Sequence, residues 1–113
     1  MNTEKIVVVV SFNIDMVVRA DKLPAPGETI LGNDFFMNSG GKGANQVVAV
    51  SRLGKEKPVF IAKIGNDLLG KNAMEVLRAE NINTGYVFID PEIPTGVALI
   101  TVDKQGENSI VVA

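Results

Sequence analysis

The most informative part of this chain reads Ser39-Gly40-Gly41-Lys42-Gly43-Ala44-Asn45-Gln46. Three glycines within four positions leave the backbone bare, and glycine costs backbone entropy, so the cluster suggests a loop shaped for the close approach of a ligand. From Ala44 to Leu53 the apolar residues recur with helical spacing. We therefore predict a loop that presents backbone N–H groups and a lysine at the start of a helix, where a polar or anionic ligand is favoured.

Two familiar glycine motifs do not fit this stretch. A P-loop has serine or threonine directly after its lysine, whereas Lys42 is followed by Gly43. A dinucleotide-binding fingerprint that starts at Gly41 needs glycine or alanine at the position of Gln46, and it also needs to follow the first strand directly. A glycine-rich turn that only begins a helix remains the general alternative.

Composition excludes several classes of function. The 113 residues are 46% apolar and 21% charged, which is ordinary for one small globular domain. The net charge of −2 and the scattered basic residues give no footprint for nucleic acid. Cys and His are absent, which excludes thiolate and imidazole chemistry and fits a reducing cytoplasm. The apolar run Ile6–Val10 is too short for a signal peptide or a membrane span, so no membrane partner is expected.

The pattern of apolar residues predicts an α/β fold. The β-branched run at the N-terminus is typical of a strand covered on both faces in a parallel sheet. The predicted order is strand, helix, strand, helix, strand, at Ile6–Val10, Gly43–Leu53, Val59–Ile64, Leu69–Glu80 and Tyr86–Ile89.

Further strands are expected outside the parallel sheet. Asp15–Ala20 and Glu28–Met37 are mixed in character and are separated by a proline-rich turn. Gly96–Val102 and Asn108–Ala113 are apolar runs separated by Asp103-Lys104-Gln105-Gly106, a hairpin turn with glycine at its last position. These strands predict a small antiparallel flap beside the parallel sheet.

The chain stops within an apolar run, Ser109–Ala113, without a cap or a polar tail. Three parallel strands and two helices also leave much apolar surface open. We therefore expect this chain to be the N-terminal part of a longer protein.

Six motifs in register resemble a known family. They are Ser11-Phe12-Asn13-Ile14-Asp15, Leu23-Pro24-x-Pro26-Gly27-Glu28-Thr29, Gly40-Gly41-Lys42-Gly43-Ala44-Asn45-Gln46, Ile64-Gly65-Asn66-Asp67-x-x-Gly70, Thr95-Gly96-Val97-Ala98-Leu99-Ile100 and Gly106-Glu107-Asn108. In order and spacing they resemble the ribokinases, sugar kinases of the ribokinase and phosphofructokinase-B superfamily, over the whole chain. One residue departs from the family pattern: Val10 stands where these kinases usually carry glycine. It could crowd the sugar pocket or shift its backbone.

The resemblance implies the N-terminal part of a ribokinase-like, Rossmann-type parallel sheet with a four-stranded β lid. It implies an incomplete domain, 1–113, with the lid at about 13–38 and 95–113 and the core of sheet and helices at about 4–12 and 41–91. The implied reaction is ATP-dependent phosphorylation of D-ribose at O5, with Mg²⁺, a monovalent cation such as K⁺, and a homodimer formed through the lid. Another sugar or nucleoside kinase, or a non-catalytic module that dimerises through the lid, stays open.

Candidate sugar-binding residues follow the first predicted strand. Asn13 and Asp15 are two apart, so their side chains share a face if the backbone is extended. A carboxylate accepts hydrogen bonds from two adjacent hydroxyls and an amide both donates and accepts, which suits a diol. An Asx turn is the alternative, and the resemblance favours sugar contact. From the glycine-rich stretch, Lys42 and Asn45 can reach the same ligand and Gly41 can offer its backbone, although a solvated lysine and a helix-start asparagine are the plain alternatives.

The resemblance places Ala98, Ile100 and Val112 on the apolar side of the sugar, although any half-buried hairpin shows the same alternation. Asp67 is expected to cap the following helix. Phosphoryl transfer needs a base and donors for the transferring group, and the family's residues for these roles have no match here. We expect no catalytic, cofactor-binding or metal-binding residue in this chain, which should be inactive by itself.

Overall fold

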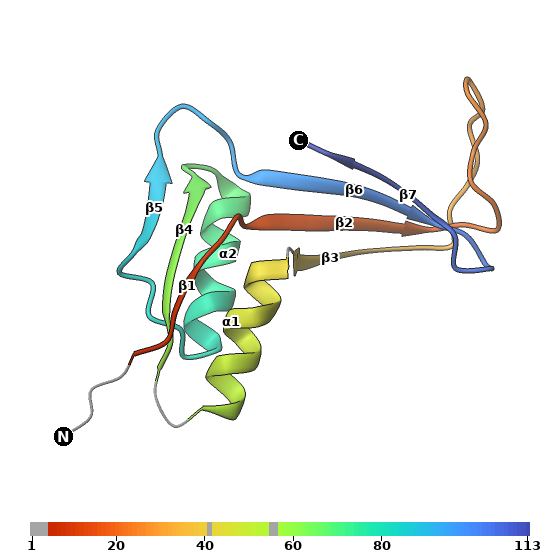
Figure 1. The fold of residues 1–113 in the computed structure, drawn as a ribbon. Helices are drawn as coiled ribbons and strands as arrows, with labels where there is room; N and C mark the ends of the chain where they lie inside the picture. Colours follow the sequence, from red (N-terminus) through yellow and green to blue (C-terminus); the bar gives the residue numbers. More distant parts are fainter. Residues whose placement is uncertain (1–4, 41, 55–56) are drawn as a thin grey trace.

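The computed structural model describes residues 5–40, 42–54 and 57–113. These residues form a three-stranded sheet, a four-stranded sheet and two helices (Figure 1). Their order is β1 (Val7–Val9), β2 (Asn13–Arg19), β3 (Asp34–Gly40), α1 (Lys42–Leu53), β4 (Val59–Gly65), α2 (Leu68–Ala79), β5 (Val87–Asp90), β6 (Gly96–Val102) and β7 (Asn108–Val112).

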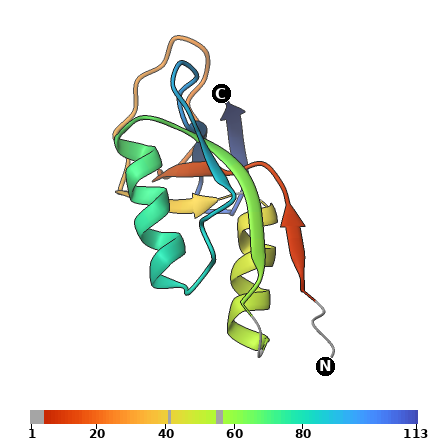
Figure 2. The same ribbon diagram turned by 90° about the vertical axis from the view of Figure 1, so that its left-hand side faces the viewer.

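The three-stranded sheet is parallel, in the order β1-β4-β5, with β1 at one edge (Figure 2). Its connections run through α1 and α2, so the predicted alternation of strands and helices is confirmed. Both helices pack on the same face of the sheet, because residues of all five elements share one buried cluster. Members of that cluster are Val8 of β1, Val47 of α1, Phe60 of β4, Leu77 of α2 and Val87 of β5.

The prediction that the first strand is covered on both faces is wrong for the described residues. Val8 is buried against the helices, whereas Val7 and Val9 point to the opposite face and are 52% and 67% exposed. A β-branched run shows that a strand suits a buried sheet, but it does not show that both covering layers are present. In the part of the chain that the structure describes, helices cover only one face of this sheet.

The four-stranded sheet projects away from the helices, in the order β3-β2-β6-β7 (Figure 1). The pairs β2–β3 and β6–β7 are antiparallel, as predicted, whereas the central pair β2–β6 is parallel. The parallel pair arises because β2 and β6 both leave the three-stranded sheet in the same direction. The predicted hairpin turn is confirmed: Gly106 has a φ of +85°, and its N–H donates to the Asp103 carbonyl at 3.1 Å.

The predicted strand at Glu28–Met37 begins later than expected, at Asp34. The Glu28 N–H donates to the Ala25 carbonyl at 2.9 Å, and the Glu28 carboxylate accepts from the Ala25 N–H at 3.2 Å and from the Lys22 ammonium at 2.9 Å. Gly27 has a φ of +76° between these contacts. The predicted strand therefore starts on the last residue of a turn, Ala25–Glu28, and residues 29–33 do not belong to β3.

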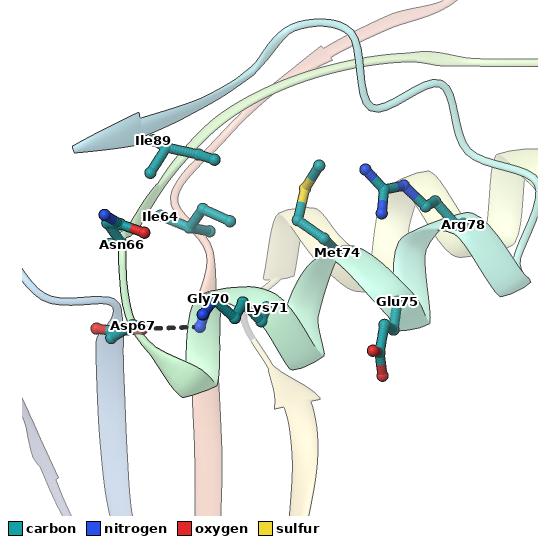
Figure 3. A pocket seen from close by; sticks show the side chains of 10 residues that line it. Ile64, Asn66, Asp67, Gly70, Lys71, Met74, Glu75, Arg78 and Ile89 are labelled. Carbon is teal, nitrogen blue, oxygen red and sulfur yellow. Dashed lines mark hydrogen bonds between the residues drawn. The ribbon is translucent and has the colours of Figure 1, made fainter. Parts of the chain in front are cut away.

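The second helix starts as predicted. Asp67 is its N-cap, and the side chain accepts a hydrogen bond from the Gly70 N–H at 2.8 Å (Figure 3). Neither α1 nor α2, the helices of the described residues, is long and apolar enough to cross a membrane.

Candidate functional site

One face of the four-stranded sheet brings five predicted residues together. Because side chains alternate along a strand, Asn13 and Asp15 share a face of β2. Asp15 pairs with Ala98 of β6, and Ala98 pairs with Val112 of β7. Ile100 lies two residues beyond Ala98 and so belongs to the same face. We call this set of five residues the Asp15 face.

The Asp15 face is wide enough to cover one side of a small ligand. Neighbouring strands lie about 4.8 Å apart, so the row Asp15, Ala98 and Val112 spans about 10 Å. Ala98 is buried at 5% exposure, and Val112 is 62% exposed. The five residues are polar on β2 and apolar on β6 and β7, which suits a molecule with hydroxyls on one side and C–H groups on the other.

The Asp15 carboxyl group is half-buried in the sheet. Burial raises the pKa of Asp15 above its ordinary value of 3.8, because desolvation disfavours the charged form. A bound hydroxyl donor would offset that desolvation, so the carboxylate is suited to accept hydrogen bonds from a ligand.

Two glycines that the predicted site does not include shape this face. A Cβ added to Gly40 would lie 2.1 Å from Oδ1 of Asp15, and one added to Gly96 would lie 2.4 Å from Oδ1 of Asn13. The Asp15 and Asn13 side chains thus lie over the neighbouring strands, where only glycine leaves room. A glycine inside a strand is the sequence signal that could have found both positions.

Helix α1 starts beside the Asp15 face. Asn13 pairs with Gly40, the last residue of β3, and α1 begins two residues later at Lys42. The first N–H groups of a helix have no partner within it, so this terminus favours a polar or anionic ligand. Lys42 and Asn45 both lie in the first turn and are exposed, and the predicted Gly41 lies outside the described residues.

Val10 packs onto the first turn of α1. A Cβ added to Gly43 would lie 1.9 to 2.4 Å from the Cγ2, Cβ and Cγ1 atoms of Val10. Val10 is half-buried against the main cluster, and its N–H donates to the Ile61 carbonyl at 3.2 Å. Its side chain therefore fills the space over the Gly43 backbone, and Gly43 cannot be enlarged without moving α1 or β1.

A cleft of about 320 Å³ lies elsewhere, between α2 and the carboxyl ends of β4 and β5 (Figure 3). Its charged lining has both signs, with Lys71, Glu75 and Arg78 along α2, and it contains no residue of the Asp15 face. Within residues 5–40, 42–54 and 57–113, no three acidic side chains form a cluster.

The family of this chain follows from comparison with known proteins. Residues 3–113 match the model of the pfkB family carbohydrate kinases. The chain belongs to this family. It is 42% identical over 107 residues to a ribokinase of Mus musculus, a match that covers 95% of this chain and 33% of that relative. The resemblance identified in the sequence is thereby confirmed.

Solved structures of pfkB-type kinases share the fold. A ribokinase of Thermotoga maritima is 38% identical with a TM-score of 0.88, and the match covers 96% of this chain and 36% of that one. An Arabidopsis thaliana ribokinase, determined with ribose and ATP, is 34% identical with a TM-score of 0.85 over 96% of this chain and 35% of that one. The predicted ribokinase-like α/β fold is confirmed, and the chain spans about a third of the length of these relatives.

Proposed function

We propose that this chain forms the sugar-binding part of a ribokinase-type kinase that phosphorylates D-ribose at O5 with ATP, giving ribose 5-phosphate. The observation that carries the proposal is the Asp15 face, where a carboxylate and an amide stand beside an apolar wall one sugar ring wide. The likeness to a ribokinase determined with ribose and ATP supports both substrates.

We assign the polar contacts to β2. Asp15 would accept hydrogen bonds from two neighbouring hydroxyls of ribose, and Asn13 would donate to one hydroxyl and accept from another. Gly40 and Gly96 support this assignment, since the lack of a Cβ at each leaves room for the Asp15 and Asn13 side chains.

The remaining contacts come from both sides of β2. Ala98, Ile100 and Val112 would pack against the C–H side of the ring. Lys42 and Asn45 would donate from the first turn of α1, and the backbone of Gly41 would add a further contact. The pairing of Asn13 with Gly40, directly before this segment, supports the approach of α1 to the sugar.

ATP would be bound outside the residues described here, with Mg²⁺ and a monovalent cation such as K⁺. When bound, ATP would supply the phosphoryl group, and Mg²⁺ would offset the charge on that group. We assign no catalytic, nucleotide-binding or metal-binding role within this chain, because its residues match none that the resemblance implies for these roles. We propose that the 113 residues alone do not phosphorylate ribose.

We also propose which parts of the chain form the lid and which form the core. Residues 13–38 and 95–113 would act as the lid and residues 4–12 and 41–91 as the core, within an incomplete domain, 1–113. A homodimer through the lid is supported by exposed apolar side chains on the sheet face opposite the Asp15 face: Val18, Phe35, Met37, Leu99 and Val111. We place the protein in the cytoplasm.

A substrate panel tests this proposal. The full-length protein that contains this chain should be assayed with ATP and D-ribose, adenosine or fructose 6-phosphate, with phosphorus NMR to locate the phosphoryl group. We expect the highest kcat/KM for D-ribose and a phosphate on O5. Equal rates with the three acceptors, or a preference for adenosine, would overturn the assignment of ribose.

A further inference from the structure

A set of buried and partly buried hydrogen bonds joins the two sheets where β6 begins. The Asp67 carboxylate accepts from the Thr95 hydroxyl at 2.7 Å and from the Thr95 N–H at 2.8 Å, in addition to the Gly70 N–H at the helix cap. The Thr95 hydroxyl oxygen accepts in turn from the Gly65 N–H at 2.9 Å. Thr95 is only 4% exposed. We call Gly65, Asp67, Gly70 and Thr95 the Asp67–Thr95 junction.

The junction is also tightly packed. A Cβ added to Gly65 would lie 2.4 Å from the Thr95 nitrogen and 2.7 Å from the Pro94 carbonyl carbon. A Cβ added to Gly70 would lie 2.2 Å from the Gly65 carbonyl oxygen. The end of β4, the start of α2 and the start of β6 therefore meet backbone to backbone, so β6 cannot shift there without breaking these contacts.

The junction lies next to the Asp15 face along the chain. Thr95 directly precedes Gly96, which pairs with Asn13 and leaves the space for its side chain. Two residues further on, Ala98 pairs with Asp15. The position of Thr95 therefore fixes the start of the strand that carries the apolar half of the face.

The connection from β5 to β6 is also fixed where it begins, at Asp90, the last residue of β5. Oδ1 of Asp90 accepts from the Glu92 N–H at 2.9 Å and from the Ile93 N–H at 2.8 Å. Oδ2 of Asp90 lies 2.6 Å from the Lys63 ammonium. The chain thus enters β6 through a segment that is fixed by one aspartate at each end.

We propose that Asp67 and Thr95 are positioning residues for the sugar: they hold the start of β6 so that Gly96 and Ala98 meet Asn13 and Asp15 in the arrangement that binds substrate. Asp67 then has a role beyond capping α2, because its second oxygen ties the cap to the four-stranded sheet. The inference rests on the proposed function, since it takes the Asp15 face as the site of ribose.

Two substitutions break the junction and spare the helix cap. Asp67→Asn keeps one oxygen for the Gly70 N–H, and asparagine caps helices as well as aspartate does. Its amide nitrogen then faces the Thr95 N–H, so two donors meet and the hydrogen bond from the Thr95 N–H is lost. Thr95→Val keeps the shape of the side chain and leaves the Gly65 N–H without its acceptor.

Matched controls are available on the same sheet. Asp103→Asn makes the same charge change in the β6–β7 turn, where the Gln105 and Glu107 N–H groups both donate to Oδ1, so an amide oxygen can replace it. Thr95→Ser keeps the hydroxyl and should restore the wild-type behaviour that Thr95→Val loses.

Calorimetric titration of the full-length variants with D-ribose and with ATP measures the positioning role. D67N loses one hydrogen bond of the junction, and T95V loses two, those to Asp67 and from the Gly65 N–H. We expect each variant to weaken ribose binding about tenfold or more, with ATP binding unchanged. T95S and D103N should stay within about twofold of the wild type. Unchanged ribose affinity in both D67N and T95V, or an equal loss of ribose and ATP affinity, would overturn the proposal.

Hydrogen–deuterium exchange of a peptide covering residues 94–102 supplies a readout that needs no sugar. We expect faster exchange in D67N and T95V than in the wild type and D103N; if D67N does not fold, T95V against T95S decides. A wild-type protein that binds no ribose would remove the proposed function, and the positioning role with it. Intact ribose binding with unchanged exchange in both variants would overturn the positioning role alone.

Discussion

Replacing Gly43 with alanine places a methyl group where the Val10 side chain already lies. The added Cβ would be 1.9, 2.1 and 2.4 Å from the Cγ2, Cβ and Cγ1 atoms of Val10, whereas carbon atoms in contact prefer about 3.5–4.0 Å. Rotation of the valine side chain moves both Cγ atoms but leaves its Cβ in place. The overlap can be relieved only by moving β1 or α1, so we expect G43A to lower the free energy of unfolding by about 1–3 kcal/mol.

The same distances predict which second substitution rescues G43A. V10A keeps the Cβ that lies 2.1 Å from the new methyl group, so G43A should still destabilise the V10A protein. V10G removes that atom, and there G43A should stabilise by up to about 1 kcal/mol, because alanine favours a helix more than glycine does. The effect of G43A on stability therefore changes sign only in the V10G background.

Urea unfolding of the full-length single and double variants measures these differences. G85A is a suitable control, because its added Cβ meets only the Asn83 side-chain oxygen, at 3.1 Å, and the unfolding free energy should change by less than about 0.5 kcal/mol. The reasoning is refuted if G43A is harmless in the wild type, or if it destabilises the V10G protein as much as the wild type.

Three other outcomes are expected. In G40A the new Cβ would lie 2.1 Å from Oδ1 of Asp15, at the end of a side chain that can rotate away, so the unfolding free energy should change by less than about 1 kcal/mol. Steady-state kinetics should then show KM for ribose raised about tenfold or more, and an unchanged KM would speak against the role of Asp15. D15N should raise the melting temperature in scanning calorimetry at pH 7, because burial raises the pKa of Asp15 and the charged form is the destabilising one; a lower melting temperature would contradict this. Hydrogen bonds from Thr95 to Asp67, and from the Ile93 N–H and Lys63 to Asp90, hold the pKa of each carboxyl below 3.8. The stability that these hydrogen bonds contribute is therefore present above about pH 4 and is lost as the pH falls further. The free energy of unfolding, measured with urea, should thus fall less between about pH 5 and pH 2.5 in D67N and D90N than in the wild type.

Local patterns were sufficient to predict much of the fold. The β-branched run at the N-terminus, the helical spacing after Gly43 and the capping residue Asp67 each identified an element that the structure contains. Such signals depend on residues that are close in sequence, so one chain is enough to read them. The strand predicted from Glu28 began too early, because Glu28 closes a turn with its side chain. Strand periodicity does not reveal such a contact.

Long-range pairing could not be predicted in the same way. The parallel pair β2–β6 joins segments that are about eighty residues apart, and its register is what sets Ala98 beside Asp15. The space over Gly40 and Gly96 likewise depends on which side chain crosses each glycine. Thr95 belongs to one of the six motifs, but its role could not be predicted, because that role arises only from contact with Asp67 and Gly65. The types of residue in the candidate site were thus readable from the sequence, and their arrangement was not.

The most direct test of the proposed sugar site is kcat/KM for D-ribose in the full-length protein, wild type against D15N. Asparagine has the size of aspartate but can accept from fewer hydroxyls and has no charge, so we expect a loss of about 100-fold, which corresponds to roughly 2.7 kcal/mol. Calorimetry at pH 7 should show that the D15N protein is at least as stable as the wild type. A D15N protein that phosphorylates ribose as well as the wild type would contradict the assignment of the Asp15 face as the sugar site.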